Sequence, residues 1–170
     1  MKNVPVRLLC LGALFVALDI VFTRSVFILK VENFDRLSLQ FLPNMLSGIV
    51  LGPYLAALSG AAGDILGMLI NSDGNAFSPL FTLSAIIRGL LYGLILHKKS
   101  LNITRIAIAL IAVTVCCDII LTPIWINILY GTNILAILPM KLVVRSVATP
   151  IYIVIAVLIL RRLKGMISNG

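Results

Sequence analysis

Long apolar runs alternate with short polar stretches along the whole chain. A bilayer core of about 30 Å is crossed by about 20 residues of helix, and six of the runs are candidates for such crossings. The predicted helices cover residues 5–22, 37–51, 54–70, 79–96, 106–129 and 135–160. The pattern therefore predicts an all-α membrane protein, a compact bundle of six transmembrane helices that forms one domain over residues 1–170.

The second predicted helix is the weakest of the six. Its apolar part, from Phe41 to Leu51, rises only about 16 Å at 1.5 Å per residue, which is half of a bilayer. A start at Leu37 lengthens it to about 22 Å. The pair Gly52 and Pro53 ends it. We therefore expect a kinked or partial crossing at this position.

Composition and charge place the chain in a membrane and orient it. Hydrophobic residue types make up 61% of the sequence and charged types 12%, whereas soluble domains carry about 25% charged residues. With six crossings, the side of the two termini holds eight basic residues and no acidic one: Lys2, Arg7, Lys98, Lys99, Arg105, Arg161, Arg162 and Lys164. The positive-inside rule then puts both termini in the cytoplasm. It also explains the net charge of +8 without nucleic acid as a partner.

Six ionisable residues lie inside the predicted helices: Asp19, Asp64, Arg88, Asp118, Lys141 and Arg145. Each costs roughly 2.5–3.5 kcal/mol at mid-bilayer, so such groups face the bundle interior, pair, or line a wet cavity. They lie in the middle or toward the outer ends of their helices, and the inner third holds none. This distribution predicts a polar pocket that opens outward and is closed below.

Lys141 and Arg145 are four residues apart on one helix, so they share a face on which like charges repel. An anionic ligand would explain both. The alternative is that each pairs with a different aspartate, for example Arg145 with Asp118. Asp64 lies on a face of small residues and could accept two parallel N–H bonds from a flat heterocycle. Its alternative role is an ion pair with Arg88.

The outer ends of the helices carry further candidates. Trp125 and Tyr130 either belong to the aromatic belt of the membrane interface or stack on a planar ligand. Arg24, at the outer end of the first helix, adds another basic group. On the same helix Ala13 and Ala17 form a small-xxx-small pair about 200° away from Asp19. Such a pair suits docking against another membrane subunit; lipid exposure or internal packing is the alternative.

The sequence offers no sign of catalysis. It has no GxxxxGK[ST], HExxH or GxSxG motif. Cys10, Cys116 and Cys117 form no CxxC pair. We expect neither an enzyme nor a metal site, and no cofactor bound by this chain.

Three stretches carry a family resemblance: Leu39-Gln-Phe-Leu-Pro-Asn-Met-Leu-Ser-Gly-Ile-Val-Leu-Gly-Pro53, Gly60-Ala-Ala-Gly-Asp-Ile-Leu-Gly67, and Phe81-Thr-Leu-Ser-Ala-Ile-Ile-Arg-Gly-Leu-Leu-Tyr-Gly93. In this order and spacing they resemble the S component, the substrate-binding subunit, of energy-coupling factor (ECF) vitamin transporters in bacterial cell membranes. The folate-specific subfamily is the most similar. S components for pantothenate or other heterocycles share the Gly-Asp-x-x-Gly pattern.

The resemblance implies a subunit that captures a vitamin from outside and works with a transmembrane coupling subunit and two ATPases, which use the ATP. Ala13 and Ala17 would contact the coupling subunit, and the loop of residues 25–39 would cap the pocket. A folate fits the candidate residues: its pterin could donate to Asp64, and its glutamate tail could bind Arg24, Lys141 or Arg145. Arg88 would also belong to the site, with Trp125 or Tyr130 over the rings.

Two alternatives come from other classes of protein. A membrane scaffold without a ligand would have its internal charges fully paired and would lack an outward cavity. A stand-alone secondary transporter would need an ion site between broken helices, which the sequence does not display.

Overall fold

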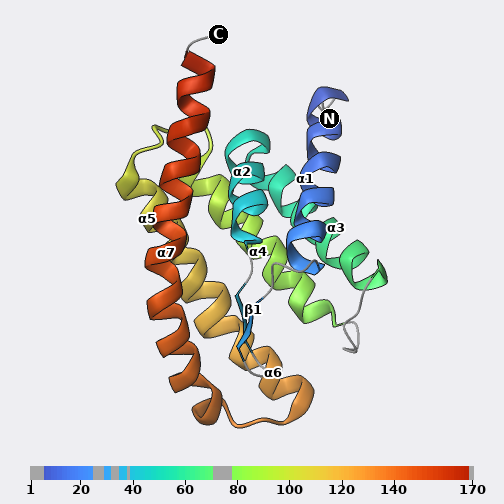
Figure 1. Cartoon of the computed structure of the whole chain (residues 1–170). Coiled ribbons are helices and arrows are strands. Elements are labelled where there is room, and N and C mark those ends of the chain that lie inside the picture. The colour runs from blue at the N-terminus through green and yellow to red at the C-terminus, as the bar shows by residue number, and fades with distance from the viewer. Residues whose placement is uncertain (1–5, 25–28, 32–34, 38, 71–77, 169–170) are drawn as a thin grey trace.

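The computed structural model describes the backbone of residues 6–24, 29–31, 35–37, 39–70 and 78–168, and the side chains of residues 6–23, 39–70 and 78–162. Helices dominate this part of the chain, and a short hairpin follows the first helix (Figure 1). The elements are α1 Val6–Arg24, β1 Leu29–Val31, β2 Asp35–Leu37, α2 Phe41–Leu51, α3 Pro53–Ile70, α4 Pro79–Leu96, α5 Ile103–Val113, the π-helical segment η1 Thr114–Leu121, α6 Thr122–Tyr130 and α7 Ile134–Ser168.

The membrane bundle expected from the sequence is confirmed. Five helical stretches are long and apolar enough to cross a bilayer, and α2 is a shorter apolar helix. Many large apolar side chains point outward, such as Leu58 and Leu69, which are 65% and 78% exposed. An apolar surface of this kind is stable against lipid rather than water.

The second helix begins later than predicted, at Phe41 instead of residue 37. The reason is a hairpin that the sequence analysis missed. Strands β1 and β2 pair antiparallel, with Leu29 opposite Leu37. Three residues per strand are too few to show a period of two, which explains why the pattern gave no signal.

The fifth predicted helix is a continuous run of α5, η1 and α6, and its middle is a π-helix of eight residues. π-Helices are rare and are frequently found at functional sites. Thr122 closes the wide turn, because its backbone N–H and its hydroxyl both donate to the Cys117 carbonyl, the hydroxyl at 2.7 Å. Pro123, which has no N–H to donate, follows directly. The segment carries Asp118 at its centre.

The bundle has two distinct ends. The start of α1 and the end of α7 lie at one end, while the hairpin and the turn between α6 and α7 lie toward the other (Figure 1). The buried core joins α2, α4, α5, η1 and α7 through Phe41, Leu42, Met45, Tyr92, Leu96, Ile106, Ala109, Leu110, Val113, Cys117, Ala156 and Leu160.

Helices α3 and α4 pack with their backbones close together, and glycines make this possible. A Cβ atom added at Gly89 would lie 2.5 Å from the Ala56 carbonyl oxygen, and one at Gly60 would lie 2.8 Å from that of Ala85. Small residues at such contacts let membrane helices approach closely. The two helices are therefore in close backbone contact at Gly60 and Gly89.

Gly89→Ala is expected to destabilise the protein by about 1–3 kcal/mol, because the methyl group meets backbone rather than a side chain that can move. Thermal unfolding in detergent measures the effect. Gly12→Ala on α1 is the matched control, since the nearest atom to its new Cβ, Ser59 Oγ, is 3.6 Å away. Equal unfolding temperatures for the two variants would contradict the packing argument.

Candidate ligand-binding site

Three charged side chains from three helical elements meet inside the bundle. Asp118 of η1 lies between two arginines: its Oδ1 is 3.3 Å from Arg88 Nη2 of α4, and its Oδ2 is 3.3 Å from Arg145 Nη1 of α7. The side chains are only 19%, 15% and 12% exposed for Arg88, Asp118 and Arg145. Two guanidinium groups thus share one carboxylate in a setting of low dielectric constant, where charge interactions are strong.

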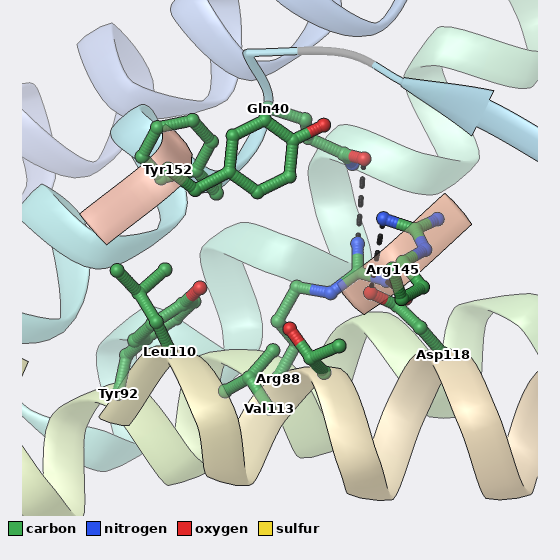
Figure 2. A pocket seen from close by; sticks show the side chains of 10 residues that line it. Gln40, Arg88, Tyr92, Leu110, Val113, Asp118, Arg145 and Tyr152 are labelled. Carbon is green, nitrogen blue, oxygen red and sulfur yellow. Dashed lines mark hydrogen bonds and ion pairs between the residues drawn. The ribbon is translucent and has the colours of Figure 1, made fainter. Parts of the chain in front are cut away.

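Gln40, which immediately precedes α2, extends the cluster. Arg88 Nη1 donates to its Oε1 at 3.3 Å. Figure 2 shows the two arginines, Asp118 and the Gln40 amide on one side of a cavity, with the dashed contacts between them. Gln40 is therefore hydrogen-bonded to the charged cluster inside the bundle.

The cavity has a volume of about 60 Å³, enough for a few water molecules. Among the described residues, its lining consists of Gln40, Phe41, Arg88, Tyr92, Leu110, Val113, Thr114, Asp118, Arg145 and Tyr152. Ligand pockets for drug-sized molecules measure about 300–1,000 Å³, so the site must widen to admit one.

An aromatic pair lies opposite the charges. The rings of Phe41 and Tyr152 are stacked with centroids 4.4 Å apart and planes 28° apart. Tyr92 is 1% exposed and contributes a hydroxyl below them. A flat ligand that carries hydrogen-bonding groups along its edge suits a cavity with ring faces on one side and paired donors and acceptors on the other.

Two of the seven predicted binding residues, Arg88 and Arg145, line this cavity. The structure pairs Arg145 with Asp118, which is the alternative considered for it. The suggested ion pair of Arg88 with Asp64 is wrong: Arg88 contacts Asp118, and Asp64 accepts a hydrogen bond of 2.7 Å from Thr82. The reason is that Asp64 lies within α3 and faces Thr82 of α4, whereas Asp118 of η1 faces Arg88 of the same helix.

Four of the other predicted binding residues, Asp64, Trp125, Tyr130 and Lys141, are described and do not line the cavity. Asp64 is held by Thr82 as described. Trp125 is half-buried and donates from Nε1 to Ser84 Oγ at 2.7 Å. Tyr130 is 56% exposed, and Lys141 is 2% exposed on α7. Arg24 ends α1, and its side chain lies outside the described residues.

The predicted docking residues Ala13 and Ala17 lie on the opposite side of α1 from Asp19, as the helical spacing predicts. Ala13 and Ala17 are exposed, and Asp19 is 5% exposed on the inner side of α1. Figure 1 shows α1 at the edge of the bundle, against α3. An outward patch of small residues is thus available on this helix.

Sequence reasoning missed Gln40, Phe41 and Tyr152 as pocket residues. Tyr152 had a signal: it is the only aromatic residue between 135 and 160, and it is seven residues from Arg145, hence on the same helical face. Gln40 and Phe41 had none, because the sequence placed both inside the predicted helix over residues 37–51 and gave no sign of which side of it faces a pocket.

Asp118→Asn is expected to destabilise the unliganded protein by about 3 kcal/mol, because it leaves two buried guanidinium groups without their shared carboxylate. The measurement is thermal unfolding in detergent without ligand. Asp64→Asn is the control, since Asp64 contacts a hydroxyl rather than a guanidinium. The prediction is wrong if the two variants unfold at the same temperature.

Comparison with known proteins identifies the family to which this chain belongs. The family described as "ECF transporter, substrate-specific component" matches residues 7–168. The chain belongs to this family, the substrate-binding membrane subunits of ECF transporters.

Two relatives and one solved structure show which members of the family are similar to this chain. The chain is 34% identical over 155 residues to the folate transporter FolT of Clostridium novyi, a match that covers 91% of this chain and 87% of that protein. It is 34% identical over 101 residues to the folate transporter FolT of Streptococcus mutans, covering 56% of this chain and 54% of that one. The crystal structure of FolT bound with folic acid superposes with a TM-score of 0.80 at 33% identity, covering 87% of this chain and 89% of the other.

Proposed function

We propose that this chain is the folate-binding S component of an ECF transporter, which captures folate outside the cell and delivers it inward with energy from ATPases in partner chains. The observation that carries the proposal is the match, over most of both chains, to a FolT structure that holds folic acid. The family assignment and the identity to the Clostridium novyi protein point the same way.

The chemistry of the cavity supports a folate. A pterin ring has an amino group and ring N–H donors next to a carbonyl acceptor, so it needs acceptors and donors side by side. Asp118 and Gln40 supply acceptors, and Arg88 and Arg145 supply donors, each of which can bind more than one acceptor at once. Because Asp118 lies in the cavity lining and Asp64 does not, Asp118 replaces Asp64 as the proposed carboxylate for the heterocycle.

The remaining candidates are assigned to the outer part of the path. Arg24, at the end of α1, and Lys141, in the second turn of α7, are proposed for the two carboxylates of the glutamate tail. Phe41 and Tyr152 offer ring faces to the pterin, and Trp125 or Tyr130 would cover the ligand nearer the outside. This division places the charged tail nearer the ends of α1 and α7 at which Arg24 and Lys141 lie, and the ring system deeper in the bundle.

The proposed orientation follows from charge and the position of the site. The positive-inside rule places both termini in the cytoplasm of a bacterial cell. The hairpin lies away from the end where α1 starts and α7 stops (Figure 1), and Gln40, which lines the cavity, immediately precedes α2. On this basis the pocket opens to the outside, and a transmembrane coupling subunit and two ATPases complete the transporter.

Titration calorimetry on the purified chain tests the proposal. We expect folic acid to bind one to one without nucleotide, and pantothenate, offered at the same concentration, to give no heat. Binding of pantothenate but not of folic acid would assign the chain to an S component for a different vitamin. No binding of either compound would favour the membrane-scaffold alternative.

A further inference from the structure

A buried polar contact joins α2 to α1 next to the site. Asn44 of α2 is 5% exposed, and so is Asp19 of α1. The Nδ2 atom of Asn44 donates to Asp19 Oδ1 at 2.9 Å and to the Gln40 carbonyl oxygen at 3.1 Å. Gln40 lines the cavity, whereas Asn44 and Asp19 do not. One amide group therefore connects the backbone of a site residue to a neighbouring helix.

The backbone carbonyl determines which end of the Asn44 amide faces these two partners. A carbonyl oxygen can only accept, so the end of Asn44 that carries the N–H groups points toward Gln40. A carboxyl group keeps acceptor capacity with or without a proton, so Asp19 can receive the second N–H in either form. The contact is tightly enclosed, since a Cβ atom added at Gly63 of α3 would lie 2.5 Å from Asp19 Oδ2.

The first turn of α2 has few backbone hydrogen bonds of its own. The helix is 11 residues long, and Gln40, which precedes it, makes no side-chain capping bond. Pro43 in the first turn has no N–H to donate. The N–H of Asn44 lies 3.4 Å from the Gln40 carbonyl oxygen, longer than the usual range of about 2.7–3.2 Å. The Asn44 side chain supplies a shorter bond to the same oxygen, which has two lone pairs.

We propose that Asn44 is a positioning residue of the ligand site: it holds the first turn of α2 against α1 and keeps Gln40 where its Oε1 accepts from Arg88. That bond, from Arg88 Nη1, is already 3.3 Å long, so a small outward shift of α2 would lengthen it beyond hydrogen-bonding distance. The inference rests on the proposed folate site and extends it to a residue that does not line the cavity.

A comparison of one substitution in two backgrounds tests the proposal. Asn44→Ala is expected to weaken folic acid binding roughly tenfold in titration calorimetry, because it removes both hydrogen bonds of the amide. In a chain that already carries Gln40→Ala, the same change is expected to weaken binding by less than about threefold, because the side chain that it positions is gone. A tenfold loss in both backgrounds would overturn the positioning role, since general damage to the fold does not depend on the Gln40 side chain.

Two changes at Asp19 test the link to α1. Asp19→Leu removes the acceptor and is expected to weaken binding roughly tenfold, whereas Asp19→Asn keeps an acceptor oxygen for Asn44 and is expected to stay within about threefold. Equal affinities for these two variants would show that α1 takes no part. Ser47→Ala is the control: Ser47 is 2% exposed and donates to the Asn44 carbonyl at 2.8 Å within α2, and its loss is expected to change the affinity less than about twofold.

Two further outcomes are decided in advance. If Asn44→Ala does not fold, Asp19→Leu in the same two backgrounds decides by the same criterion. Absence of folic acid binding by the unmodified chain would overturn the proposed function and this inference with it, whereas equal losses in the two backgrounds would overturn this inference alone.

Discussion

Arg88→Met is expected to lower the affinity for folic acid by more than about 100-fold, the largest effect of a single change on binding. Arg88 contacts both Asp118 and Gln40. Loss of one partner from a buried ion pair costs about 3–5 kcal/mol, because the other charge is left without compensation, and each 1.4 kcal/mol corresponds to a factor of ten in affinity. Methionine keeps the length and apolar stem of the side chain, so the change acts mainly on charge and hydrogen bonding.

Titration calorimetry with folic acid measures the effect, and Arg105→Met is the matched control. Arg105 is exposed on α5, and we expect its replacement to change the affinity less than twofold. Thermal unfolding without ligand separates a lost binding group from a damaged fold. Arg88→Met binding within threefold of the original would remove Arg88 from the site.

Ala13→Trp is expected to abolish folate uptake by cells while binding to the purified subunit stays within twofold. Ala13 is exposed on α1, as is Ala17 one turn further on. Small residues at a contact let membrane helices approach closely, and an indole at this position would separate the subunit from the proposed coupling subunit. The pocket lining does not include Ala13, so binding has no reason to change.

Uptake of labelled folic acid, in cells that also produce the partner subunits, provides the readout. Leu14→Trp is the control: Leu14 is the next residue and is 54% exposed, so the same indole would face lipid instead. Loss of uptake in both variants would show a general defect of insertion. Loss of binding in Ala13→Trp would take the docking role from this face.

Much of the architecture could be predicted from the sequence, because the thickness of the bilayer sets the length of each membrane-spanning helix. Helix α4 has the predicted bounds, and its start is marked by Ser78, whose hydroxyl accepts from the Leu80 N–H at 3.4 Å, and by Pro79 in the first turn. The boundaries were weakest where length gave no constraint. The hairpin displaced the start of α2, and the break of regular geometry in η1 produced no signal in the apolar pattern.

The binding residues were only partly predictable for a related reason. The sequence by itself determined that acidic and basic groups lie inside an apolar bundle, since burying charge in lipid is costly wherever it occurs. Which acid meets which base depends on how the helices pack, and only the tertiary structure decided that Asp118, and not Asp64, lies between Arg88 and Arg145. The same holds for Gln40, because contacts between residues 48 positions apart in the chain are set by the packing of helices and leave no periodic trace in the sequence.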